Sequence, residues 1–176
     1  MRGGTRRTGR AARVGRRRPR HTRGGAGVSR RQAPADARQA LADALTAEYA
    51  AIYAYGPIGV RLSGAERRGA RSAEAAHRAR RDALVLQLSA DGGQVSADRA
   101  GYALPFPVTD QAGALRLAVE IEERTAAFWR AALPVTSGAD RTRALNALTD
   151  CAVRATRWRR AAGVTPVTAA FPGRPR

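Results

Sequence analysis

The stretch that decides the fold is SGAERRGARSAEAAHRARRDALVLQL, residues 63–88. Ser63 and Glu66 have the spacing of a capping box, which marks the start of a helix. Glu74 and His77 lie one turn apart further along, and Leu84 continues the same face. The stretch therefore predicts a helix that carries a carboxylate and an imidazole on the face it packs with.

Three other segments have the helical spacing of apolar residues. The first predicted helix carries the stripe Leu41, Leu45, Glu48, Ile52 and Tyr55. A later helix, between Asp110 and Pro134, carries Leu115, Val119, Glu122, Ala126, Trp129 and Leu133. The last, from Ser137 to Gly163, is predicted to face inward with Leu145, Leu148, Ala152 and Ala155. The chain is therefore predicted to be all-α, with four helices.

The connections between these helices are short, except for residues 92–109. This segment contains Tyr102-Ala-Leu-Pro105-Phe106-Pro107, and its prolines exclude a helix. Its apolar residues favour packing along the helices, because a loop this long inside a domain needs a reason. One long crossover that joins two helical hairpins is a known four-helix bundle topology. We expect that topology over residues 35–163, followed by a short C-terminal tail over residues 164–176.

The charge of the chain is concentrated at its N-terminus. All 32 basic residues are arginine, and residues 1–31 hold 12 of them with no acidic residue. The rest of the chain has 20 arginines and 14 acidic residues, so it is only mildly basic. Residues 1–34 have little to bury and are predicted to be a disordered arginine-rich tail. They also lack the apolar run that a signal peptide or a membrane span needs.

Three interpretations of this tail stay open. It is a solvated extension, a polyanion-binding segment, or the product of a start codon assigned too far upstream. Binding to DNA or another polyanion would depend on release of counterions. The residues that would carry it are Arg6, Arg7, Arg16, Arg17 and Arg18.

Acidic residues on the predicted core faces are the main chemical signal. Glu48 and Glu122 each follow a stripe leucine by seven residues, so both should project into the bundle. A buried carboxylate without a partner is costly, so a metal ion or an arginine is expected beside them. Arg81 is the predicted arginine, because it lies one turn beyond His77 and a guanidinium can pair with a carboxylate through two hydrogen bonds.

Several segments resemble the ferritin-like superfamily, and within it an uncharacterised ferritin-like family of high-GC, actinobacterial-type bacteria. The residues that carry the resemblance are 48–55 (EYAAIYAY), 77–82 (HRARRD), 102–110 (YALPFPVTD), 122–124 (EER), Trp129 and Trp158. The resemblance covers about residues 36–173 and implies a ferritin-like four-helix bundle.

In active members of that superfamily, the first and third helices each supply a glutamate, and the second and fourth each supply a Glu-x-x-His pair. The resemblance therefore implies Glu48, Glu74, His77 and Glu122 as ligands of iron or manganese. The fourth helix departs from the pattern, because Asp150-Cys-Ala-Val153 has a valine where the histidine should be. A helical wheel also places Asp150 nearly opposite the predicted inward stripe.

Three hypotheses for function follow. The first is a non-catalytic structural or interaction bundle with a degenerate metal site, in which Arg81 joins a polar core network. The second is an iron- or manganese-binding protein that uses the partial carboxylate–histidine site, and the third is polyanion binding through the tail. No nucleophile arrangement is visible, so enzymatic activity is left open but not favoured. The partner is unknown, and a homo-oligomer is compatible with the fold. The single cysteine, Cys151, is consistent with a reducing, cytoplasmic compartment.

Overall fold

The structure is a computed structural model that describes residues 26–91, 95 and 97–174. The arginines predicted to bind polyanions, Arg6, Arg7, Arg16, Arg17 and Arg18, lie outside the described residues, and that hypothesis stays a prediction. The first helix begins at Ala26, within the segment predicted as a tail. It also continues through Gly56-Pro57, although a Gly-Pro dipeptide commonly interrupts a helix.

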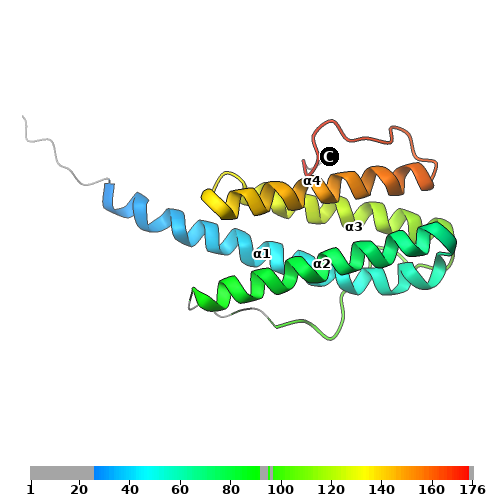
Figure 1. Ribbon diagram of the computed structural model, residues 1–176, viewed down its shortest axis with the longest axis horizontal. Helices are drawn as coiled ribbons and strands as arrows, with labels where there is room; N and C mark the ends of the chain where they lie inside the picture. The colour runs from blue at the N-terminus through cyan, green and yellow to red at the C-terminus, as the bar shows by residue number, and fades with distance from the viewer. Residues whose placement is uncertain (1–25, 92–94, 96, 175–176) are drawn as a thin grey trace, which may run out of the picture.

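Four helices form a bundle, and the described residues contain no strand, which confirms the predicted all-α fold class. The helices are α1 (Ala26–Arg61), α2 (Gly64–Ala90), α3 (Gln111–Ala132) and α4 (Gly138–Ala161). Figure 1 shows α1 paired with α2 and α3 paired with α4 as two hairpins. Helices α1 and α3 pack closely across the bundle, whereas α2 and α4 meet only sparsely.

The turn before each hairpin's second helix uses the same two residue types. Ser63 and Ser137 are extended N-cap residues, and each is followed by a glycine with a positive φ, 52° at Gly64 and 53° at Gly138. Neither serine side chain caps its helix, so the capping box predicted at Ser63 is not formed. Asp110 does cap α3, by accepting a hydrogen bond of 2.7 Å from the backbone N–H of Gly113.

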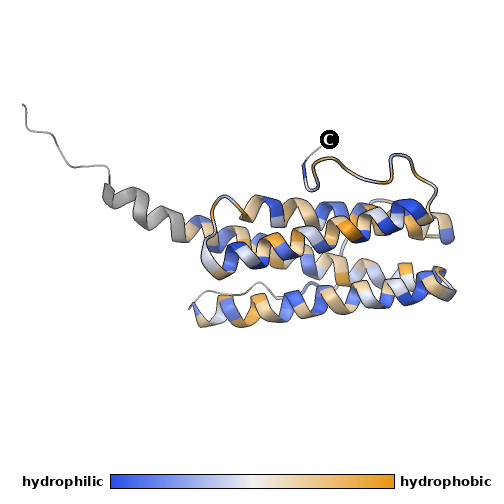
Figure 2. Ribbon diagram, turned by 45° about the horizontal axis from the view of Figure 1, so that its top comes forward, coloured by the Kyte–Doolittle hydropathy of each residue, from blue (hydrophilic) through white to orange (hydrophobic). Residues whose placement is uncertain are grey.

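The core consists of two apolar clusters along the bundle axis. One contains Tyr55, Ile58, Leu62, Leu117 and Trp158 among its buried residues. The other contains Leu41, Leu45, Leu84, Leu88 and Trp129. Figure 2 shows the apolar residues distributed along all four helices, interleaved with polar ones. The fully buried polar residues Glu48, His77 and Glu122 belong to neither cluster and form a polar layer between them.

The crossover packs along the bundle, as predicted. Leu104, Phe106 and Val108 lie against the first cluster, and Tyr102 lies against the second. The rings of Tyr102 and Tyr53 are 5.7 Å apart, which ties the crossover to α1. Apolar contact of this kind explains why a long, proline-rich connection is held against the helices.

The inward face of α4 agrees with the prediction in part: Ala155 is buried and Leu148 packs against the second cluster, but the face is rotated from the predicted one. Leu145 was expected inside, but it is 52% exposed, and the buried face is Ala144, Ala147, Cys151, Ala155 and Trp158. Trp158 explains the difference, because burying this large ring contributes more than burying a leucine, and its N–H finds a partner inside. This rotation of α4 also turns Asp150 toward α2, where the wheel had placed it on the far side.

Candidate functional site

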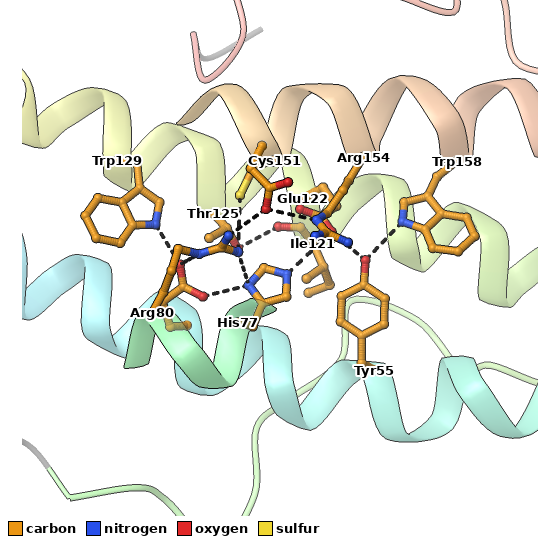
Figure 3. A network of polar contacts seen from close by, with 12 residues as sticks. Tyr55, His77, Arg80, Ile121, Glu122, Thr125, Trp129, Cys151, Arg154 and Trp158 are labelled. Carbon is orange, nitrogen blue, oxygen red and sulfur yellow. Dashed lines mark hydrogen bonds and ion pairs between the residues drawn. The ribbon is translucent and has the colours of Figure 1, made fainter. Parts of the chain in front are cut away.

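Glu48, on α1, is the centre of the polar layer, and Figure 3 shows its partners His77, Arg80 and Trp129. Its side chain is fully buried. One carboxylate oxygen, Oε2, lies 2.6 Å from His77 Nδ1. The other, Oε1, accepts hydrogen bonds from Trp129 Nε1 at 2.6 Å and from Arg80 Nε at 2.7 Å. Both oxygens of Glu48 are therefore bonded to donors that come from α2 and α3.

Glu122, on α3, faces the opposite side of the same imidazole. Its Oε1 lies 3.4 Å from His77 Nε2 and accepts a hydrogen bond of 2.6 Å from the hydroxyl of Tyr55. That hydroxyl in turn accepts a hydrogen bond of 3.0 Å from Trp158 Nε1. His77 is thus held between two buried carboxylates, with a tryptophan N–H at each end of the network.

Arg80 connects this layer to α4 across the sparsely packed side of the bundle. Its Nη1 donates to Asp150 Oδ2 at 2.7 Å, while its Nε donates to Glu48. Its Nη2 lies 2.8 Å from His77 Nδ1 and 3.8 Å from Cys151 Sγ. When Nδ1 donates its hydrogen to Glu48, it accepts none from Arg80, and Nη2 donates toward the sulfur instead.

The charges of the layer balance without any further ion. Burial alone would lower the pKa of His77, but hydrogen bonds to Glu122 and Glu48 outweigh burial and raise that pKa. Burial alone would raise the pKa of Glu48, but His77, Arg80 and Trp129 hold it below its usual value. When His77 is protonated, its imidazolium and Arg80 match the two buried glutamates in number of charges. Asp150 is matched by Arg154, whose Nε donates to it at 3.0 Å.

We expect the free energy of unfolding to be largest between the unperturbed pKa values of Glu48 and His77, 4.5 and 6.5. The raised pKa of His77 contributes stability below 6.5 that is lost as the pH rises through the folded-state value. The lowered pKa of Glu48 contributes stability above 4.5 that is lost as the pH falls through its folded-state value. Urea unfolding at a series of pH values measures both limbs. In His77→Gln the free energy of unfolding should fall less as the pH rises. An unchanged fall in this variant would contradict the assignment of that pH dependence to His77.

Three of the four predicted metal ligands come together, and the fourth does not. Glu48, His77 and Glu122 meet in the core, but the side chain of Glu74 is 30% exposed and forms an ion pair of 2.7 Å with Arg78. The placement of Glu74 in the core was therefore wrong. The buried face of α2 runs through Ala70, Ala73 and His77, so the residue after Ala73 is turned about 100° away from it.

The arginine that pairs with the core carboxylates also differs from the prediction by one position in the sequence. Arg81 was expected to pair with the core carboxylates, but it pairs with Asp82 at the surface, at 2.8 Å. Arg80 takes the role instead. Both follow His77 by about one turn, so spacing alone cannot choose between them. The choice depends on Asp150, which the rotation of α4 brings opposite Arg80.

Trp129, Trp158 and Tyr55 donate hydrogen bonds inside the polar layer that the pattern of apolar stripes did not predict. A signal was present, because a buried tryptophan N–H or tyrosine hydroxyl usually finds a polar partner. Trp129 is fully buried and Tyr55 nearly so, and the partners within reach are the predicted core carboxylates.

The residues of the polar layer do not fit a metal ion. Both oxygens of Glu48 are occupied by donors, and the guanidinium of Arg80 brings a fixed positive charge to the place where a cation would bind. Across the described residues, no three His, Cys, Asp or Glu side chains form a group that could hold an ion. Glu122 Oε2 has no hydrogen bond to any described residue, and it is the one such oxygen among the buried carboxylates of the layer.

The layer also offers no activated nucleophile. Burial and the nearby charge of Glu122 raise the pKa of the Cys151 thiol and of the Tyr55 hydroxyl well above their usual values. Both groups therefore stay protonated at neutral pH. A cleft of about 480 Å³ between α2 and α4 reaches only the outer members, Arg80 and Asp150.

Comparison with known proteins agrees with this picture of the fold. Residues 40–176 match the model of a family described as a domain of unknown function, DUF4439. The crystal structure of a conserved hypothetical protein from Mycobacterium tuberculosis is similar, with 42% sequence identity and a TM-score of 0.72. The match covers 80% of this chain and 99% of that one. The comparison with curated proteins gives no match. In the described part of the chain, no helix has both the length and the apolar character needed to cross a bilayer.

Proposed function

Since the chain belongs to the DUF4439 family of domains of unknown function, we propose its function from its geometry. The proposal is a non-catalytic scaffold of the ferritin-like superfamily, in which Arg80 and protonated His77 take the electrostatic place of metal ions. The protein would act through its surface, as a structural or interaction module, and the polar layer would hold the bundle in a single packing arrangement.

Two features support the ferritin-like assignment. The bundle is made of two hairpins joined by a crossover that packs along the helices. Glu48 on α1 and Glu122 on α3 face each other across His77 on α2, as the first, third and second helices of a di-metal bundle would place their ligands.

The position of Arg80 is the observation that supports a non-catalytic role. Its guanidinium bonds Glu48 and Asp150 at 2.7 Å each and contacts the Nδ1 side of His77. A divalent ion at this point would have to displace a cation that is already held by two carboxylates. Since Arg80 compensates the glutamate charge, the electrostatic reason for binding a metal is removed.

Elemental analysis of the purified protein tests this proposal. After incubation with ferrous iron or manganese and removal of excess ion, we expect no stoichiometric metal in the wild-type chain. The matched sample is Glu48→Gln, which removes the central carboxylate. Stoichiometric metal in the wild type that is lost in Glu48→Gln would favour the metal-binding alternative and refute the scaffold proposal. Metal that persists equally in both samples would point to binding elsewhere on the surface, and would leave the polar layer without an ion.

A further inference from the structure

A second cavity lies on the other side of the bundle, between α3, α4 and the C-terminal segment, residues 162–174. We call it the C-terminal groove. Its volume is about 780 Å³, within the range of pockets that bind small molecules. Figure 1 shows the C-terminal segment turning back over α4 instead of running away from the bundle. The groove therefore has two helices as its floor and a chain segment along one edge.

The C-terminal segment is seated closely on α3. Gly173 has a φ of 73°, and a Cβ at this position would lie 2.6 Å from the carbonyl oxygen of Ala126. Only glycine accepts both this conformation and this approach. The carbonyl of Pro172 also accepts a hydrogen bond of 3.4 Å from Arg130. These contacts hold the edge of the groove in place beside its floor.

A buried arginine lines the groove. Arg159 is 3% exposed, and its Nε makes no hydrogen bond to any described residue. Its Nη2 forms an ion pair with Glu123, and its Nη1 donates to the carbonyl of Pro166 at 3.4 Å. A buried guanidinium N–H without an acceptor is rare in folded proteins, and an acceptor supplied by a ligand would satisfy it.

The walls of the groove suit an aliphatic chain. Six of the lining residues on the two helices are apolar, and they come from both helices: Ala126, Ala127, Leu148, Ala152, Val153 and Ala155. On α3 the lining runs from Glu120 to Arg130, a length of about 15 Å at the rise of a helix. Small residues leave room between the helices that larger ones would fill.

The charge around the groove favours an anion with a single negative charge. Arg124 is paired with Glu120 at 2.5 Å, and Arg159 contacts Glu123. Arg130 contacts a carbonyl, and Arg174 lies over the ring of Phe171 at 5.7 Å, so both add positive charge at the rim. The two glutamates would repel a doubly charged phosphate more strongly than a carboxylate.

We propose that the C-terminal groove binds a medium-chain aliphatic carboxylate. The carboxylate accepts a hydrogen bond from Arg159 Nε, and the hydrocarbon chain lies along the alanines of α3 and α4. This inference does not depend on the proposed function, because the groove shares no residue with the network around Glu48 and His77.

Isothermal titration calorimetry of the full-length chain with decanoate tests the inference. We expect saturable binding at a single site, with no measurable binding of acetate, which lacks the chain. Decyltrimethylammonium has a similar chain and the opposite charge, and it should bind at least about tenfold more weakly, since a charge-assisted hydrogen bond is replaced by repulsion. Absence of saturable decanoate binding, or equal binding of the cationic analogue, would overturn the proposal.

Two variants assign the binding to this groove. Arg159→Gln should weaken decanoate binding about tenfold or more. Its control is Arg157→Gln, an exposed arginine two residues earlier on α4 and outside the lining, which should bind as the wild type does. Ala152→Phe fills the groove from a partly exposed position and should abolish binding even if Arg159→Gln fails to fold. Circular dichroism confirms folding. Wild-type affinity in folded Arg159→Gln or Ala152→Phe would refute the site.

Discussion

Replacing Glu48 with alanine is expected to lower the free energy of unfolding by about 3–5 kcal/mol, because it breaks a buried charge network by removing one partner. The carboxylate is fully buried and bonds three donors, from His77, Arg80 and Trp129. Its loss leaves the imidazolium facing a cavity and the indole N–H without an acceptor. Urea denaturation followed by circular dichroism measures the change.

Glu74→Ala is the matched control for this substitution. Both glutamates were predicted metal ligands on core faces, but Glu74 pairs with Arg78 at the surface. An i,i+4 pair of this kind contributes only about 0.3–0.5 kcal/mol, so the control should stay close to the wild type. Comparable destabilisation by the two variants would contradict the surface position of Glu74 and would mean that its side chain packs in the core.

Replacing Arg80 with methionine is expected to cost about 3 kcal/mol, the lower end of the range for an ion pair broken on one side. Methionine keeps much of the apolar stem but leaves Glu48 without its guanidinium partner. The loss is moderated at Asp150, whose side chain is 39% exposed and keeps its bond to Arg154. Thermal and urea unfolding of Arg80→Met both measure this loss of stability.

Arg81→Met is the control for Arg80→Met, because the neighbouring arginine bonds only Asp82 among the ion pairs of the described residues. We expect a change within about 0.5 kcal/mol for this surface substitution. The double variant Glu48→Ala, Arg80→Met should be less destabilised than the sum of the single changes, since the two residues share one interaction. Strict additivity would show that Arg80 and Glu48 do not act as a pair.

Much of the fold could be predicted from local patterns. Stripes of apolar residues identified the four helices, and the prolines and apolar residues of 102–107 identified a crossover that packs on the bundle. The inward face of α4 could not be read in the same way. Leu145 was predicted to face inward but is exposed, because the burial of Trp158 and its hydrogen bond to Tyr55 favour another rotation of the helix.

The candidate site could likewise be predicted only in part. Sequence spacing was enough to place Glu48, His77 and Glu122 on core faces, because each recurs with the apolar residues of its own helix. It could not separate Arg80 from Arg81, or Ala73 from Glu74, since one position is a rotation of only about 100°. Those choices depend on which neighbour each helix meets.

By itself, then, the sequence determined that this protein is an all-α bundle of two hairpins with acidic residues and a histidine at its centre. The tertiary structure decided what those residues do. The packing of α4 turned Asp150 toward α2 and drew Arg80 into the gap between the two helices. A periodic pattern records which side of a helix is apolar, whereas partners across a bundle are selected only when the helices are rotated against one another.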